Sequence, residues 1–313
     1  MGPVPARPGA ELGNVGRQVG TCPTGVPGMR TDTRFWPVDK VILTYFVFTT
    51  TLILIWWSNI PDAWQHLLGH FGAAALLIYE VKRPNRTSWI FRNWYALPYV
   101  GSCYKEMAIL IRAIRRTDAE RFLADLDFRI WHAYPSIWLE RIYSPPLTEY
   151  LQIVYTLFIP AVLLVAFLLW KKGRYAEFQY YGFLIALGFL TSYIGYLLVP
   201  ARGPRFLLKH LEQMPLHGMW LFRSMQTTLD QLESAHFDCF PSGHTELTIL
   251  AWWGTRLVSK QLFRVYFAYT LSIIFATVYL RYHYTVDLLA GAIVALILIL
   301  ASPWLFTKLQ GRA

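Results

Sequence analysis

Long apolar segments recur along this chain, and they restrict the folds that it can adopt. Several of them reach the length of about 20 residues that an α-helix needs to cross a bilayer. Hydrophobic residues make up 55% of the chain, more than in an ordinary soluble domain. We therefore predict an all-α fold, a polytopic membrane helical bundle with about six to eight transmembrane helices. The segments cover residues 41–57, 64–80, 147–170, 178–199, 243–258, 264–281 and 284–306.

The chain divides into three parts by composition. Residues 1–34 are rich in Gly, Pro and Arg and contain no apolar core, which predicts a disordered N-terminal tail. Residues 35–146 combine N-terminal spans with an interfacial amphipathic segment, in which arginines alternate with tryptophans. Residues 147–308 hold the strongest apolar segments and form the predicted membrane core.

The basic residues indicate how the bundle is oriented. The formal net charge is +10, and the lysines and arginines lie in tails and loops between the apolar segments. This pattern fits anionic lipid head groups and cytoplasmic loops rather than nucleic acid. If every strong segment from residue 147 onward crosses, three short basic connections share the cytoplasmic side. The connection 200–242 and the turn at His283 then lie together on the periplasmic, extracellular or lumenal side.

The number of crossings before residue 147 is open from sequence. The segment 96–111 contains Lys105 and Glu106, so it is a poor free-standing span and is either re-entrant or packed inside the bundle. Without this crossing, residue 1 lies on the non-cytoplasmic side. With it, residue 1 lies on the cytoplasmic side, which the N-terminal arginines favour.

Cysteines and histidines give no pattern that predicts a bound metal. The three cysteines, Cys22, Cys103 and Cys239, have no paired zinc-type spacing, and nothing around Cys239 indicates a nucleophilic thiol. His66 and His70 lie four residues apart on one helix face, where interior polar contacts are favoured over a metal pair. We expect no metal and no cofactor.

One stretch, residues 239–246, has the features of a helix start that binds an anion. Pro241 and Ser242 suit the first turn and the cap of a helix, Gly243 leaves its backbone accessible, and His244 follows. Unpaired N–H groups and the helix dipole favour a phosphate there. The alternative is an ordinary capped helix that carries an incidental histidine.

Two further stretches complete a set of residues suited to phosphate chemistry. His283 and Asp287 lie four residues apart at the start of an apolar helix, so the carboxylate can accept the imidazole N–H. Arg202 and Arg205 follow the end of a span, where they can bind phosphate oxygens or simply anchor the membrane interface. Together these residues favour phosphoryl transfer through a phosphohistidine, with one histidine as nucleophile and the other as general acid.

The order Arg-x-Pro, Pro-Ser-Gly-His, His-x-x-x-Asp resembles the type 2 phosphatidic acid phosphatase (PAP2) superfamily. This family includes lipid phosphatases and vanadium haloperoxidases. The version Arg281-Tyr282-His283-Tyr284-x-x-Asp287, with Ala290-Gly291 after it, is similar to the branch of inositol phosphorylceramide synthases and their bacterial relatives. The resemblance implies a PAP2-like core over residues 147–308 and assigns the following roles: His283 as nucleophile, Asp287 as its orienting carboxylate, His244 as general acid, and Ser242, Gly243, Arg202, Arg205 and Arg281 as phosphate-binding residues.

Two positions depart from the family pattern. The lysine seven residues before the first arginine is absent, since counting back reaches Gly195 or Leu198. The arginine six residues before the nucleophile is Thr277 here, and Arg281 is the nearest substitute. Both departures favour a specialised branch over a broad phosphatase.

The expected substrate is a membrane phospholipid or a polyprenyl or sphingolipid phosphate, and the acceptor is open. Water would make the protein a lipid phosphatase, whereas inositol, a sugar or ceramide would make it a phosphotransferase. A vanadate-dependent peroxidase is a minor alternative. A non-enzymatic transporter or scaffold is the other class, because His66, His70, Lys105 and Glu106 could line a path through the membrane.

Overall fold

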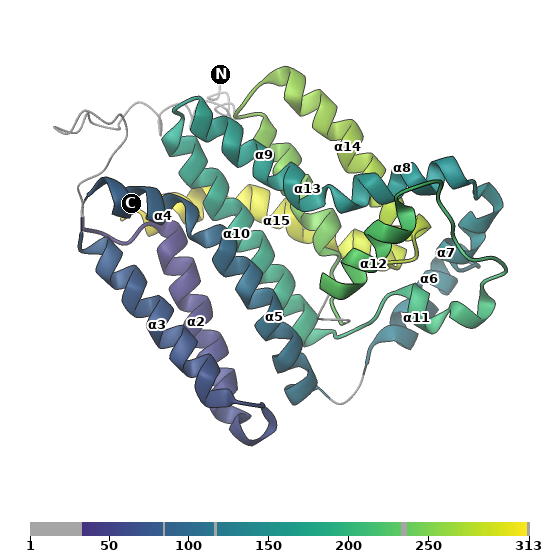
Figure 1. The fold of residues 1–313 in the computed structure, drawn as a ribbon, viewed down its shortest axis with the longest axis horizontal. Helices are drawn as coiled ribbons and strands as arrows, with labels where there is room; N and C mark the ends of the chain where they lie inside the picture. Colours follow the sequence, from purple (N-terminus) through teal and green to yellow (C-terminus); the bar gives the residue numbers. More distant parts are fainter. Residues whose placement is uncertain (1–32, 84, 116–117, 233–236, 312–313) are drawn as a thin grey trace, which may run out of the picture.

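The computed structural model describes residues 33–311 apart from 84, 116–117 and 233–236, and this part of the chain is built from helices (Figure 1). The predicted all-α fold is confirmed. Most of the predicted N-terminal tail lies outside the described residues. The first half contains α2 (Pro37–Ile55), α3 (Ala63–Val81), α4 (Arg86–Trp94), α5 (Ala96–Ile114), α6 (Glu120–Trp131) and α7 (Pro135–Trp138). The second half contains α8 (Pro145–Thr156), α9 (Phe158–Lys171), α10 (Tyr175–Leu198), α11 (Pro204–Leu207), α12 (Phe222–Leu232), α13 (Gly243–Thr255), α14 (Lys260–Tyr279) and α15 (Thr285–Leu309).

Four of these helices, α2, α10, α14 and α15, are long and apolar enough to cross a membrane. The bent pair α8–α9 would make a fifth. These helices make the chain an integral membrane protein. The expected six to eight crossings also counted α3, α5 and the 13-residue α13, which are less apolar or shorter.

The segment 147–170, predicted as a span, is bent in the structure. The chain breaks at Leu157, and the axes of α8 and α9 differ by 48°. Pro160 supplies the physical reason, since it has no N–H to donate to the carbonyl of Thr156 and its ring crowds that carbonyl. Proline is tolerated in the first turn of a new helix, so α9 begins just before it.

Helix α10 lies at the centre of the bundle and packs against α2, α5, α9, α13 and α15. Its 24 residues are apolar on nearly every side, as expected of a helix surrounded by others. One hydrophobic core extends from Trp36 in the N-terminal part to Phe306 in α15. Residues 35–146 and 147–308 therefore share a core, and their division into two domains stays a prediction.

Several basic residues lie together at one end of the bundle. Arg174 NH1 donates to Leu257 O and Lys172 Nζ to Val258 O at 3.3 Å, so the α9–α10 and α13–α14 turns lie together. Lys40 Nζ donates to Leu309 O at 2.6 Å, which joins the start of α2 to the end of α15. Tyr180, near the start of α10, hydrogen-bonds Ser302 near the end of α15, so all of these segments share one end.

The segment 96–111 runs the length of the bundle as α5, alongside α10 (Figure 1). Arg115 Nε, just past the end of α5, donates to Leu197 O near the end of α10. The contact between Lys40 and Leu309 places the start of α2 and the end of α15 at the same end of the bundle. This is the arrangement expected if the segment 96–111 crosses.

Candidate active site

The motif around Ser242 starts α13 in contact with α15. Ser242 caps the helix, with its Oγ accepting from Thr245 N at 3.3 Å. Its own N–H donates to Asp287 O at 3.0 Å. Gly291 in α15 makes this approach possible, because a Cβ at that position would lie 2.5 Å from Ser242 O. The starts of α13 and α15, which carry the two motifs, are thus packed directly on each other.

His244 and His283 meet at this contact. Their ring centroids are 5.7 Å apart with an interplanar angle of 63°. His283 is 4% exposed, and its ring lies in a small pocket rather than on the surface. The structure therefore brings together the two imidazoles that a phosphohistidine mechanism needs.

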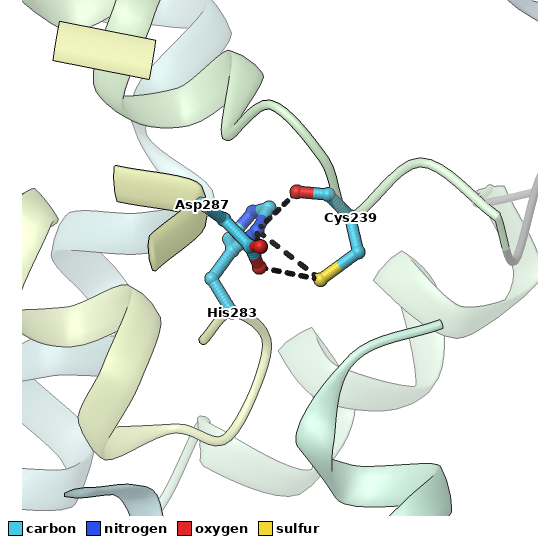
Figure 2. A group of neighbouring side chains, drawn as sticks. All are labelled: Cys239, His283 and Asp287. Atoms are coloured by element: carbon cyan, nitrogen blue, oxygen red, sulfur yellow. Dashed lines mark hydrogen bonds and ion pairs between the residues drawn. The ribbon is translucent and has the colours of Figure 1, made fainter. Parts of the chain in front are cut away.

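The Nδ1 atom of His283 is hydrogen-bonded to a backbone carbonyl and lies near a carboxylate (Figure 2). It lies 2.9 Å from the carbonyl oxygen of Cys239 and 3.5 Å from Asp287 Oδ2. A carbonyl can only accept, so Nδ1 carries the proton and a neutral His283 keeps its lone pair on Nε2. Asp287 Oδ2 is itself fixed by Tyr284 N and by Cys239 Sγ, both at 2.8 Å. These contacts fix the orientation of the His283 ring.

Cys239 has no sign of a nucleophilic thiol. Burial, and then the charge of Asp287, raise the pKa of the Cys239 thiol well above its usual value. The thiol therefore stays protonated and donates to Asp287.

Aromatic rings surround His244 at the α8–α9 bend. Tyr155 stacks on the imidazole at 4.3 Å, and Phe158 lies 4.6 Å from it. Tyr155 also stacks on Tyr282 at 4.3 Å. The bend at Leu157 thus places one ring from each of the two helices against His244.

Two cavities meet at His244. A large, mainly apolar cavity of about 980 Å³ extends from His244 between α5, α9 and α10. A small polar pocket lies beside it and is lined by residues that include Arg205, Cys239 and His283. Tyr155, Asp238 and His244 line both. His244 therefore stands at the border between an apolar space and a polar one.

The three predicted phosphate-binding arginines lie in different places. Arg205 lines the polar pocket, where its guanidinium pairs with Asp230 at 2.6 Å and lies over the ring of Tyr282 at 4.6 Å. Arg202 is paired with Glu120 and does not line that pocket.

Arg281 also points away from the polar pocket. It is paired with Glu140 at 2.7 Å and Glu212 at 2.8 Å, and its side chain is 5% exposed. Its backbone carbonyl accepts from Arg205 N at 3.0 Å, so it contacts the pocket through the main chain. Of the three, Arg205 is the one that lines the pocket together with His283.

The sequence did not single out Asp127, which positions the start of α15. Its carboxylate accepts from Thr285 N at 2.9 Å, Val286 N at 3.0 Å and Thr285 Oγ1 at 2.7 Å. Asp127 is 2% exposed, but in the sequence it is one of several acids in an amphipathic stretch. No local signal separates it from the exposed Asp125 on the same helix.

Glu246 is a second residue that was missed. It is fully buried, and its carboxyl oxygens accept from Ser192 Oγ at 2.6 Å and Thr191 Oγ1 at 3.0 Å. This joins α13, two residues after His244, to α10. An acidic residue inside an apolar segment was the available signal.

His66 and His70 lie away from this site, in α3. Both contact Glu106 of α5, His66 Nδ1 at 3.3 Å and His70 Nε2 at 2.9 Å. Thr50 Oγ1 of α2 lies 2.8 Å from His70 Nδ1. These residues make interior polar contacts between three helices, as the sequence favoured.

Comparison with known proteins identifies the family. The family model described as the PAP2 superfamily matches residues 123–301, more than half of the chain and the whole of the site around His244 and His283. No curated protein and no solved structure matches the chain. The chain thus belongs to the PAP2 superfamily, and this membership indicates phosphatase or phosphotransferase activity.

Proposed function

We propose that this protein is a lipid-phosphate phosphatase or phosphotransferase that works through a phosphohistidine on His283. The observation that carries the proposal is the pair of imidazoles 5.7 Å apart, one of which has its Nδ1 proton held by a backbone carbonyl. The chemistry needs one unprotonated nitrogen and one acid on the same phosphate. In this proposal His283 provides the unprotonated nitrogen and His244 provides the acid.

In the first step, Nε2 of His283 attacks phosphorus and the bond to the leaving oxygen breaks. Asp287 stabilises the positive charge that develops on the imidazole. His244 donates its proton to the leaving alkoxide. Arg205, with Ser242, Gly243 and the N–H groups at the start of α13, is proposed to surround the phosphate oxygens.

In the second step, the acceptor oxygen attacks phosphorus, the P–Nε2 bond breaks and frees His283, and His244 takes the proton of the acceptor. Water as acceptor gives phosphatase activity, and inositol, a sugar or ceramide gives transfer. The relation to inositol phosphorylceramide synthases belongs to this proposal. Arg202 and Arg281 were expected to bind phosphate directly, but their ion pairs favour a role in holding the loops around Arg205.

The apolar cavity supports a lipid as the substrate. It reaches His244, so a hydrocarbon chain in the cavity would bring its phosphate ester oxygen next to the proposed acid. The acid would then protonate the lipid alcohol as it leaves. Apolar walls with a few polar groups at one end are typical of lipid and small-molecule sites.

The site is proposed to face the periplasm, the extracellular space or the lumen. The support is the basic end of the bundle, where the α9–α10 and α13–α14 turns lie together. Short basic connections favour the cytoplasm, so the opposite end, with His283, would face away from it.

The test uses purified enzyme, a labelled phospholipid and three variants. His283→Ala is expected to lose turnover by at least about a thousandfold, and His244→Ala by about 10²–10⁴-fold. His66→Ala, a histidine variant away from the site, should retain activity. Brief incubation of wild type should also give an acid-labile phosphorylated protein that His283→Ala does not form. Turnover by folded His283→Ala at the wild-type rate would overturn the proposal.

The same assay, run with and without inositol or ceramide, decides the acceptor. Release of inorganic phosphate alone would identify a phosphatase. A labelled product that contains the added alcohol would identify a transferase.

A further inference from the structure

We propose that Cys239, His283 and Asp287 form an inhibitory binding site for a thiophilic divalent cation such as Zn²⁺. The three side chains offer a sulfur, an imidazole nitrogen and a carboxylate oxygen, which are the ligand types that Zn²⁺ prefers. All three are buried, and their candidate ligand atoms lie within 4.8 Å of one another. Figure 2 shows them converging on one point between the loop before α13 and the start of α15.

The distances between the ligand atoms are close to those around a tetrahedral zinc ion. Zn–S bonds of about 2.3 Å and Zn–N or Zn–O bonds of about 2.0–2.2 Å put neighbouring ligand atoms roughly 3.3–3.6 Å apart. Cys239 Sγ lies 3.6 Å from His283 Nδ1, and this nitrogen lies 3.5 Å from Asp287 Oδ2. Two contacts must change. The Sγ–Oδ2 separation of 2.8 Å must widen, and that contact is a hydrogen bond whose proton the metal would replace. The carbonyl oxygen of Cys239, now 2.9 Å from Nδ1, must turn away to admit the ion.

A second observation concerns the other oxygen of the Asp287 carboxylate. Asp287 is 0% exposed, and its Oδ1 has no hydrogen-bond partner among the described residues. A buried carboxylate oxygen without a donor is costly, so a cation or a water molecule would stabilise it. Two of the three ligand residues, Cys239 and His283, border the polar pocket.

Binding would change the tautomer of the nucleophile. Zn²⁺ replaces the thiol proton, which is released, and bonds to the thiolate, to Asp287 and to Nδ1 of His283. The proton that Nδ1 now shares with the Cys239 carbonyl moves to Nε2, and the imidazole remains neutral. Nε2 then has no lone pair for attack. This loss of activity rests on the proposed function of His283, whereas metal binding itself does not.

The experiment separates binding from inhibition. The protein is prepared with Cys22→Ser and Cys103→Ser, so that Cys239 is its one remaining thiol. Cd²⁺, a spectroscopic substitute for Zn²⁺, should bind in a one-to-one ratio and produce thiolate-to-metal charge-transfer absorption. Cys239→Ser in this background should abolish the band. Asp287→Asn, which keeps the volume of the side chain, should weaken binding at least about tenfold, as expected for loss of a charged ligand.

Zn²⁺ should inhibit the single-thiol protein in the same concentration range in which it displaces Cd²⁺. A band that persists in Cys239→Ser, or that wild type never develops, would overturn the site. If Cys239→Ser fails to fold, X-ray absorption of the Zn²⁺-loaded single-thiol protein decides. One sulfur and at least one imidazole around zinc support the site, and a shell of oxygen and nitrogen without sulfur refutes it. Binding without inhibition would instead count against Nε2 of His283 as the nucleophile.

Discussion

Replacement of Asp127 by alanine tests whether a residue outside the predicted motifs positions the nucleophile. The carboxylate holds two backbone N–H groups and one hydroxyl at the start of α15. Hydrogen bonds to a charged group contribute about 1.5–3 kcal/mol each, so the two backbone bonds alone would amount to about 3–6 kcal/mol. Water molecules can hydrogen-bond the N–H groups that are freed at the helix end, and they recover part of this free energy. We therefore expect Asp127→Ala to lower the free energy of unfolding by about 2–4 kcal/mol.

The same change should reduce turnover. His283 and Asp287 flank Thr285, and a displacement of about 1 Å at a reacting group can cost a hundredfold in rate. Asp127→Ala should therefore lower kcat about tenfold to a hundredfold, with little change in KM. Asp127→Asn keeps one acceptor oxygen, so its kcat should lie between that of Asp127→Ala and that of wild type.

Asp125→Ala is the matched control, because Asp125 is an exposed acid on the same helix. Both variants remove one negative charge from α6. Unfolding in detergent is followed by circular dichroism, and kcat and KM are measured on labelled lipid phosphate. If Asp127→Ala matched Asp125→Ala in stability and in kcat, the positioning role would be refuted.

Two further predictions test the phosphate pocket and the helix contact. Arg205→Ala should weaken inhibition by vanadate, a phosphate analogue, at least about tenfold, because a charged hydrogen bond to the anion is lost. Arg202→Ala should weaken vanadate inhibition less than Arg205→Ala does, because the Arg202 side chain pairs with Glu120 and does not line the pocket, and equal effects of the two variants would contradict the assignment. Gly291→Ala should destabilise the protein by about 1–3 kcal/mol, since its Cβ would lie 2.5 Å from Ser242 O. Gly182→Ala, where the added Cβ meets nothing within 4 Å, should be neutral or stabilising, and a stable Gly291→Ala would refute the close contact.

The helical fold was predictable because membrane-length apolar segments leave few alternatives. Inside a bilayer the backbone N–H and C=O groups of a segment must hydrogen-bond to one another, so each strong segment was expected to form a helix. The break at Leu157 was missed because the apolar pattern continues through it. Pro160 was the available signal, and its effect depends on whether neighbouring segments can hold the two halves at an angle.

The candidate site was predictable in part. The i, i+4 spacing of His283 and Asp287 and the helix start at Ser242 are local features, and the sequence displays them directly. Long-range contacts are different. That Arg205 faces the pocket while Arg202 pairs with Glu120 depends on where α6 packs, which no local pattern encodes. The backbone carbonyl of Cys239 that accepts from His283 Nδ1 likewise could not be predicted from the sequence, since every residue has a backbone carbonyl.

The apolar cavity beside His244 has walls from two parts of the chain. Leu97 and Tyr104 of α5 lie outside the segment that matches the PAP2 superfamily, whereas Val162, Phe189 and His244 lie inside it. Under the proposed function, the residues that cleave the bond therefore lie within the segment 123–301 that matches the family. The width of the cavity for the lipid tail depends partly on α5, which lies outside that segment. Substitutions along α5 could then change which chain lengths or branching patterns the enzyme accepts without touching its reacting groups. Relatives with the same histidines and a different α5 would differ in the lipid tails that they accept before they differ in the reaction that they catalyse.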